Sequence, residues 1–212
     1  MVIFDLDGTL INSSMDICKA INYAIEGTGI KPVSVERTIT LVGEGISKLF
    51  DKLMAAENVQ ADPAPIVSRF SEYYEAHLVD NTPLYPGVEE TLKALEGYKK
   101  VIVSNKREMM SVRVLQALGI AKYFDYVSGS DTAPDKKPSP VPIQLVLAKY
   151  GIKPSEAVIV GDSNYDIDAG LAAGIKTIAV TYGYRPIHEL KHAHFMVDKF
   201  PDILPIIKRL AE

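Results

Sequence analysis

Two aspartates directly after an apolar segment are the strongest sign of chemistry in this sequence. Asp5 and Asp7 follow the apolar residues 1–4, and side chains two positions apart in an extended segment share a face, about 6.6 Å apart. Gly8 allows the chain to turn away sharply, and Thr9 adds a hydroxyl. An apolar strand that ends in two acids places charge where unpaired burial is costly, which favours a functional site over a solvated acidic turn.

Further polar residues follow later apolar segments. Ser104 and Asn105 offer a hydroxyl and an amide that suit phosphoryl oxygens, although a serine at this place also suits the start of a helix. Asp162 follows another apolar segment, and Asp166 stands one helical turn beyond it. These residues are the candidate partners of the first two aspartates.

A lysine in a proline-rich turn completes the candidate set. Lys136 and Lys137 precede Pro138 and Pro140, whose rings restrict the backbone. Lys137 is bonded directly to Pro138 and is the better candidate, with an ordinary surface turn as the alternative.

Carboxylates with a lysine and a hydroxyl form a site for a hard divalent cation and a phosphate dianion. Mg²⁺ prefers octahedral oxygen ligands, of which Asp5 and Asp162 can supply two. A cation is needed because an anionic nucleophile must approach an anionic phosphoryl group. The residues therefore predict Mg²⁺-dependent phosphoryl transfer.

The apolar segments predict an α/β fold with a doubly wound parallel sheet, covered by helices on both faces. The predicted strands are residues 1–4, 100–103, 126–128, 157–160 and 177–180. Open sheets of this kind bind ligands at the carboxyl ends of their strands. The candidate residues all stand at such ends or in a turn, so we expect them to converge.

The long interval between the first two strands predicts an inserted helical domain. It shows helical periodicity and no convincing strand. We predict a core domain of residues 1–14 and 85–212 and a helical cap domain of residues 15–84. Within the cap, Glu44 stands between two glycines in a loop that either reaches the active site or forms an exposed turn between helices. At the site, Glu44 would disfavour an acidic leaving group unless a cap cation such as Arg37 or Lys48 offsets its charge.

The ordered motifs resemble the haloacid dehalogenase superfamily, in its phosphoglycolate phosphatase-like group with a helical cap. Asp5-Leu6-Asp7-Gly8-Thr9 matches the nucleophile motif of that family, Ser104 its second motif and Lys137 its third. Gly161-Asp162-Ser163 with Asp166 matches the fourth. The match extends over essentially the whole chain.

The resemblance implies a mechanism and a set of roles. Asp5 would be the nucleophile that forms an aspartyl-phosphate, and Asp7 the general acid and then base. Asp5, Asp162 and the Asp7 carbonyl would hold Mg²⁺, with Asp166 in support. The phosphoryl group would be held by Thr9, Ser104, Asn105 and Lys137. The expected reaction is hydrolysis of a small phosphate monoester, similar to phosphoglycolate.

The same residue types also fit other functions. A phosphosugar mutase such as β-phosphoglucomutase uses the same groups, but such enzymes usually carry Val where Thr9 stands here. A pyrophosphatase or nucleotidase is a further possibility. A signalling receiver domain also uses an acidic cluster and a lysine, although it has no helical insertion.

Composition narrows the partners and the location. The net charge of -4, without a basic stripe, argues against nucleic acid as a partner. Cys18, the single cysteine, cannot form an internal disulfide and fits a helix core in a reducing compartment. No signal peptide or membrane span is expected. We predict a cytoplasmic monomer or small homo-oligomer that acts on a small phosphorylated metabolite.

Overall fold

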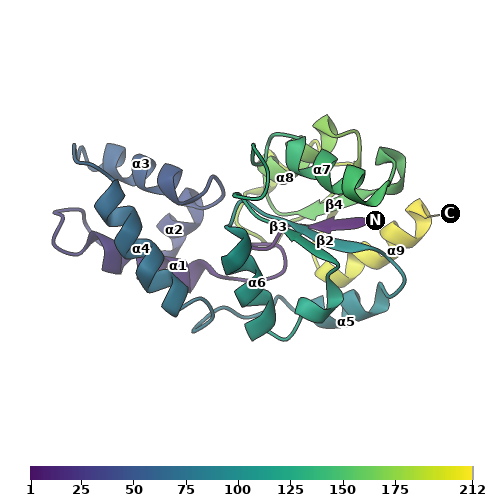
Figure 1. Ribbon diagram of the computed structural model, residues 1–212, viewed down its shortest axis with the longest axis horizontal. Coiled ribbons are helices and arrows are strands. Elements are labelled where there is room, and N and C mark those ends of the chain that lie inside the picture. The colour runs from purple at the N-terminus through teal and green to yellow at the C-terminus, as the bar shows by residue number, and fades with distance from the viewer. Residues whose placement is uncertain (212) are drawn as a thin grey trace. The chain divides into compact units, whose positions relative to one another are not determined.

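The computed structural model describes residues 1–211, and the chain divides into two compact units (Figure 1). The first unit comprises Met1–Asn12 and the chain from Pro83 onward, and the second is Ser13–Thr82. We predicted that the chain passes between the two units after residues 14 and 84. In the structure it does so after residues 12 and 82, two residues earlier in each case.

Six parallel strands form one sheet in the described chain, in the order β3-β2-β1-β4-β5-β6. They are β1 (Val2–Phe4), β2 (Lys100–Val103), β3 (Tyr126–Ser128), β4 (Val158–Gly161), β5 (Lys176–Val180) and β6 (Phe195–Val197). β1 is central and pairs with β2 on one side and β4 on the other, so that Phe4 lies beside Ile102 and Val160. β1, β2 and β4 are buried throughout, which explains their nearly continuous apolar sequences.

Helices cover both faces of this sheet (Figure 1). They are α5 (Val88–Ala94), α6 (Glu108–Ala117), α7 (Val141–Tyr150), α8 (Asn164–Ala172) and α9 (Ile203–Leu210), with 3-10 turns at Ala121–Tyr123, Pro154–Glu156, Ile187–Glu189 and Phe200–Asp202. On one face, Ile3 and Ile159 share a core with α7 and α8. On the other, Phe4 packs against Phe124 and Phe200. The predicted α/β fold with a doubly wound parallel sheet is confirmed.

The five predicted strands match β1 to β5 to within one residue at each end. β6 was not predicted. It is a three-residue edge strand whose Met196 is 47% exposed, so it lacks the run of buried apolar residues that marks the interior strands.

The second unit is helical throughout and contains no strand within residues 13–82, as predicted. Its helices are α1 (Ser14–Ile25), α2 (Val35–Leu41), α3 (Ile46–Ala56) and α4 (Ala64–Ala76). Phe50, Phe70 and Tyr74 form a buried aromatic cluster between α3 and α4. Cys18 is buried in α1, as expected for a core residue.

A buried aspartate joins the two ends of the helical unit. The carboxylate of Asp16 accepts hydrogen bonds from the backbone and side-chain nitrogens of Asn81 and from the Thr82 hydroxyl, each 2.7 Å long. Three donors satisfy a charge that would otherwise be costly to bury. These bonds explain why the unit closes at Thr82.

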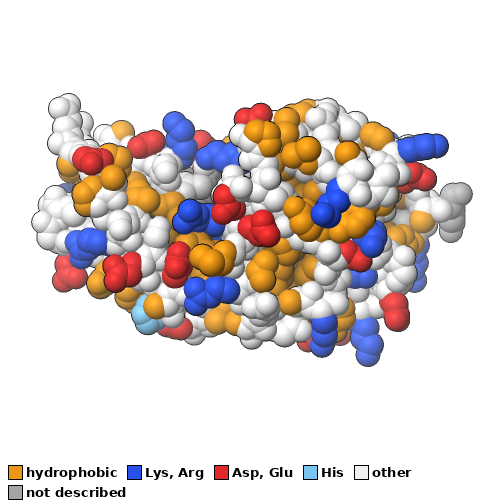
Figure 2. All heavy atoms as spheres, in the orientation of Figure 1, with side chains coloured by type: hydrophobic (Ala, Val, Ile, Leu, Met, Phe, Trp, Pro, Cys, Tyr) orange, Lys and Arg blue, Asp and Glu red, His pale blue; other side chains and the backbone are white. Residues whose placement is uncertain are grey.

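The surface carries mixed charge. Acidic and basic side chains are interspersed on the face that Figure 2 shows. Among residues 1–211, no helix combines the length and the apolar character that a membrane span requires.

Candidate active site

The site lies where the direction of strand order reverses. β1 and β4 are neighbours in the sheet, while the strands that follow each of them extend to opposite sides. Asp5 follows β1 and Asp162 is the next residue after β4. The Asp5 N–H donates to the Val160 carbonyl at 3.0 Å, which aligns the two strand ends. Such reversal points are the usual ligand sites of open α/β sheets.

Three carboxylates converge at this edge. One oxygen each of Asp5, Asp162 and Asp166 lies within 4.8 Å of the others. Asp162 and Asp166 are almost completely buried, and Asp5 is 8% exposed. Oxygen ligands of this kind suit a hard divalent cation, so the donor set fits the metal that the sequence predicted.

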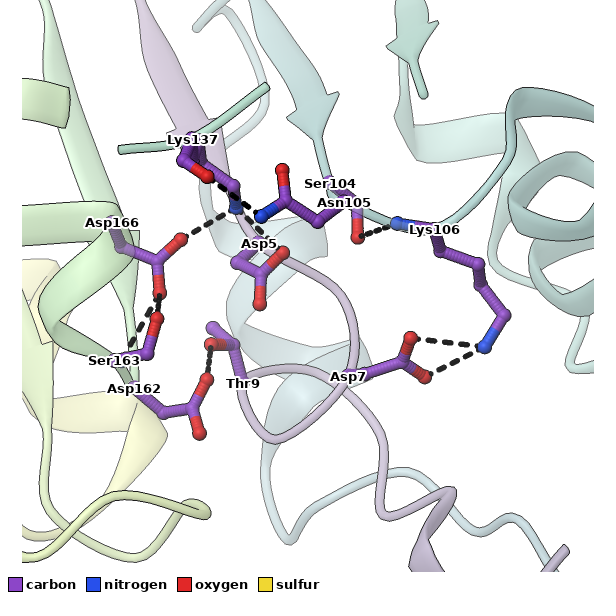
Figure 3. A network of polar contacts seen from close by, with 10 residues as sticks. All are labelled: Asp5, Asp7, Thr9, Ser104, Asn105, Lys106, Lys137, Asp162, Ser163 and Asp166. Atoms are coloured by element: carbon purple, nitrogen blue, oxygen red, sulfur yellow. Dashed lines mark hydrogen bonds and ion pairs between the residues drawn. The ribbon is translucent and has the colours of Figure 1, made fainter. Parts of the chain in front are cut away.

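Lys137 bridges two of these carboxylates (Figure 3). Its Nζ lies 2.8 Å from Asp5 Oδ1 and 2.5 Å from Asp166 Oδ1. The other oxygen of Asp166 accepts from the Ser163 backbone N–H and hydroxyl at the start of α8. Both oxygens of Asp166 are thus engaged by protein groups, which suits a residue that positions Lys137.

The ionisation of the cluster reflects burial and crowding of like charges. Burial raises the pKa of Asp5 to about 6; Lys137 opposes this shift, and Asp166 adds to it. Burial, with Asp166 and Asp5 nearby, raises the pKa of Asp162 well above its usual range. Burial alone would lower the pKa of Lys137, but Asp166 and Asp5 outweigh it and raise that pKa. Three acids thus share a single ammonium, and a divalent cation would favour their ionised forms.

The loop after β1 is fitted closely around Asp162. Gly8 has φ +92°, and a side chain there would collide with the Asp162 carboxylate. The Thr9 hydroxyl donates to Asp162 Oδ1 at 3.1 Å, and the Tyr184 N–H donates to Oδ2 at 2.7 Å. The loop thus orients a carboxylate. The structure places the Thr9 hydroxyl on Asp162, whereas its predicted contact with phosphate stays a prediction.

The loop after β2 brings two predicted residues to the same edge. Ser104 Oγ accepts from the Lys106 N–H at 3.3 Å, so its own proton is available to an incoming oxygen. The alternative that Ser104 caps the next helix is wrong, because α6 begins only at Glu108 and Arg107 is its N-cap. Asn105 Nδ2 donates to the Lys137 carbonyl at 2.9 Å and so links two loops of the site.

Asp7 has a partner that the sequence did not assign. Both of its carboxylate oxygens lie 2.9 Å from Lys106 Nζ. In Figure 3 the Asp7 side chain points toward Lys106 and away from Asp5 and Asp162. The position of Lys106 immediately after Asn105, at a strand end that already carried two candidates, was the available signal.

Similarity to known proteins identifies the family of this chain. The family described as Haloacid dehalogenase-like hydrolase matches residues 2–180. The phosphoglycolate phosphatase of Chromobacterium violaceum is 36% identical over 213 residues, covering 98% of this chain and 96% of that one. The chain belongs to the haloacid dehalogenase-like hydrolase family.

Solved structures agree with this assignment. A predicted phosphoglycolate phosphatase from Haemophilus somnus has a TM-score of 0.91 at 33% identity, covering 97% of this chain and 96% of that one. A β-phosphoglucomutase from Clostridium difficile has a TM-score of 0.83 at 21% identity, covering 99% and 96%, and shows a shared fold. This haloacid dehalogenase-like hydrolase is therefore an enzyme, and the receiver-domain alternative is excluded.

Glu44 lies within the helical unit of this hydrolase. It forms an ion pair with Lys52, and their side chains are 27% and 42% exposed. Lys52 is thus a cap cation that offsets the charge of Glu44. Lys48 lies near another acid, with its Nζ 3.9 Å from Asp51. An exposed pair of this kind neutralises Glu44 only in part, because water and salt screen it. The effect of Glu44 on substrate choice stays a prediction.

Proposed function

We propose that this enzyme is a Mg²⁺-dependent phosphatase that hydrolyses phosphoglycolate or a similar small phosphate monoester. The buried cluster of Asp5, Asp162 and Asp166 around the Lys137 ammonium carries the proposal. It combines a nucleophile, oxygen ligands for a cation and a positive charge for a phosphate at one edge of the sheet. The relatives named phosphoglycolate phosphatase support the substrate class.

The metal would be held by Asp5, Asp162 and the Asp7 carbonyl. The raised pKa values of both carboxyl groups fit a site built for added positive charge. Bound Mg²⁺ supplies the charge that keeps these groups ionised and offsets repulsion between the nucleophile and the phosphate.

The chain's own residues would carry out two displacements. Asp5 attacks phosphorus, the bond to the leaving oxygen breaks, and Asp7 donates a proton to that oxygen. Water then attacks the aspartyl-phosphate while Asp7 takes a proton from the water, the bond between phosphorus and Asp5 breaks, and inorganic phosphate leaves. Lys137 and Ser104 hold the phosphoryl oxygens during both steps.

The first prediction concerns the metal and the substrate class. We expect hydrolysis of phosphoglycolate and of a generic aryl phosphate with Mg²⁺, and loss of at least about 99% of both activities in excess chelator. A screen of phosphate esters, sugar phosphates, nucleotides and pyrophosphate, with release of inorganic phosphate as readout, checks this. Turnover that survives the chelator would contradict the proposal. Isomerised sugar phosphate without phosphate release would favour a mutase.

The site points to the class of partner, and the composition supports the proposed location. The proposed partner is a small phosphorylated metabolite, and the proposed setting is the cytoplasm, with the protein a monomer or small homo-oligomer. Gel filtration with light scattering tests the oligomeric state.

The second prediction concerns the helical unit, which we propose acts as a cap that selects the leaving group. Glu44→Gln should raise kcat/KM for phosphoglycolate relative to a neutral sugar phosphate by about threefold, because it removes a repelling charge that Lys52 neutralises only in part. Asp51→Asn, which removes an exposed acid paired with Lys48 in the same unit, is the control. An unchanged ratio would remove Glu44 from the specificity determinants.

A further inference from the structure

The ion pair between Lys106 and Asp7 is nearly inaccessible to water. The Lys106 side chain is 6% exposed and that of Asp7 is 12% exposed. The ammonium lies equally close, at 2.9 Å, to both carboxylate oxygens. Separating two charges in such surroundings without a substitute partner is strongly unfavourable.

The proposed reaction requires Asp7 to leave this position. In Figure 3 its carboxylate points away from Asp5, yet the acid role places it beside the oxygen that departs from phosphorus. When Asp7 turns toward the substrate, the Lys106 ammonium loses an anionic partner. The cost falls if another carboxylate takes the same place, since it offers the same two acceptor oxygens.

We infer that Lys106 is a specificity residue that binds an anionic group, a carboxylate, on the leaving part of the substrate. The inference rests on the proposed phosphatase function and deepens it. The substrate carboxylate replaces the Asp7 carboxylate on Lys106. Asp7, freed from the ammonium, takes up a proton from water and turns toward the leaving oxygen, to which it then donates that proton. The charge around the ammonium is the same before and after this exchange. An ester with a neutral leaving group has no carboxylate for this exchange.

The position of Lys106 in the site supports this role. It follows Ser104 and Asn105 in the loop after β2, and the loop is anchored by the bond from Asn105 to the Lys137 carbonyl. The Lys106 N–H also donates to Ser104 Oγ. The ammonium thus projects from the same loop as a proposed phosphate ligand, which suits a small molecule whose carboxylate and phosphate are close together. Lys106 also supplies, in the core unit, the cation that offsets the second negative charge of such a substrate.

Two substrates of similar size separate this role from a structural one. Phosphoglycolate carries a carboxylate where 2-hydroxyethyl phosphate carries a hydroxymethyl group. The wild-type enzyme should prefer phosphoglycolate by at least about tenfold in kcat/KM. Lys106→Met should lower kcat/KM for phosphoglycolate by about thirtyfold or more, mainly through KM. It should not lower the value for 2-hydroxyethyl phosphate, because Asp7 then has no ion pair to break. Lys106→Arg should keep much of the preference, because guanidinium also binds carboxylates.

The controls distinguish failure of the inference from failure of the proposed function. Lys153→Met removes an exposed lysine and should leave both substrates unaffected. Equal losses for both substrates in Lys106→Met would mean that Lys106 only supports the fold or Asp7, and would overturn the inference. A wild-type enzyme that hydrolyses both esters equally well would also overturn it, whether or not the variants fold, while leaving the phosphatase proposal intact. Absence of Mg²⁺-dependent hydrolysis of any ester would overturn both.

Discussion

Asp5→Asn is expected to lower kcat to less than about one hundredth of the wild-type value, a barrier increase of about 2.7 kcal/mol or more. An amide is a poor nucleophile toward phosphorus, so the first displacement fails. Asparagine also weakens the proposed metal site, because it removes one of the clustered negative charges. Turnover of an aryl phosphate by freshly purified protein measures the effect.

The same variant should fold normally, which separates chemistry from stability. Lys137 keeps Asp166 as a partner when Asp5 becomes neutral, so no buried charge is left unpaired. The pKa of Asp5 is raised to about 6, so its carboxylate form opposes folding at higher pH and the substitution removes that penalty. The Tm without Mg²⁺ at pH 8 should therefore equal or exceed that of wild type. Asp168→Asn, which changes an exposed aspartate of α8, is the control and should keep full activity. Activity above one hundredth in Asp5→Asn would exclude Asp5 as the nucleophile.

Asp162→Asn should have opposite effects on activity and on metal-free stability. It removes a proposed Mg²⁺ ligand, so activity and the rise in Tm on adding Mg²⁺ should both be lost almost completely. The side chain can keep its contacts. Asparagine Oδ1 can accept from the Tyr184 N–H, and its Nδ2 can donate to the Thr9 hydroxyl, which is able to accept. A local collapse is therefore not expected.

The effect on stability depends on pH in a defined direction. The pKa of Asp162 is raised in the folded protein by burial and by Asp166 and Asp5. A raised pKa means that its contribution to stability is complete below the unfolded-state pKa and is lost as pH rises through the folded-state pKa. Without Mg²⁺ at pH 8 the variant should thus be more stable than wild type, by roughly 2–4 °C in Tm for each 1 kcal/mol of relief. The difference should shrink near pH 4. A variant less stable than wild type at pH 8 without metal, or one still stabilised by Mg²⁺, would refute the proposed role.

The polar residues at strand ends could be recognised from sequence because they depend on local patterns. A buried parallel strand must be apolar throughout, so a polar residue directly after it stands out, as Asp5, Ser104 and Asp162 do. Parallel strands bring their carboxyl ends to one edge, so the convergence of these residues follows from the fold class. Lys137 could be chosen over Lys136 by its bond to Pro138, and in the structure it contacts two of the carboxylates.

Tertiary structure alone decided which of these groups bond to one another. The pair of Asp7 with Lys106 joins residues that are distant in sequence, and the position of Lys106 directly after Asn105 does not reveal which carboxylate it contacts. The same holds for the Tyr184 N–H on Asp162 and for Asp16 on the Asn81-Thr82 segment. Such contacts depend on how loops pack in the folded chain, and no short sequence pattern specifies that packing. Strand and helix periodicities, in contrast, are imposed by the backbone at every residue.

The amino-acid sequence by itself determined the strand ends, the helical insertion and the identity of the acidic and basic groups, because each follows from short-range periodicity and from the side chains' own chemistry. The strand order, the edge strand β6 and the choice of Lys52 as the partner of Glu44 were decided only by the folded chain. The folded chain also set the pKa values of the buried carboxyl groups. A carboxyl group of ordinary acidity becomes one whose pKa is about 6 when burial removes its water and Asp166 is brought close, as happens at Asp5.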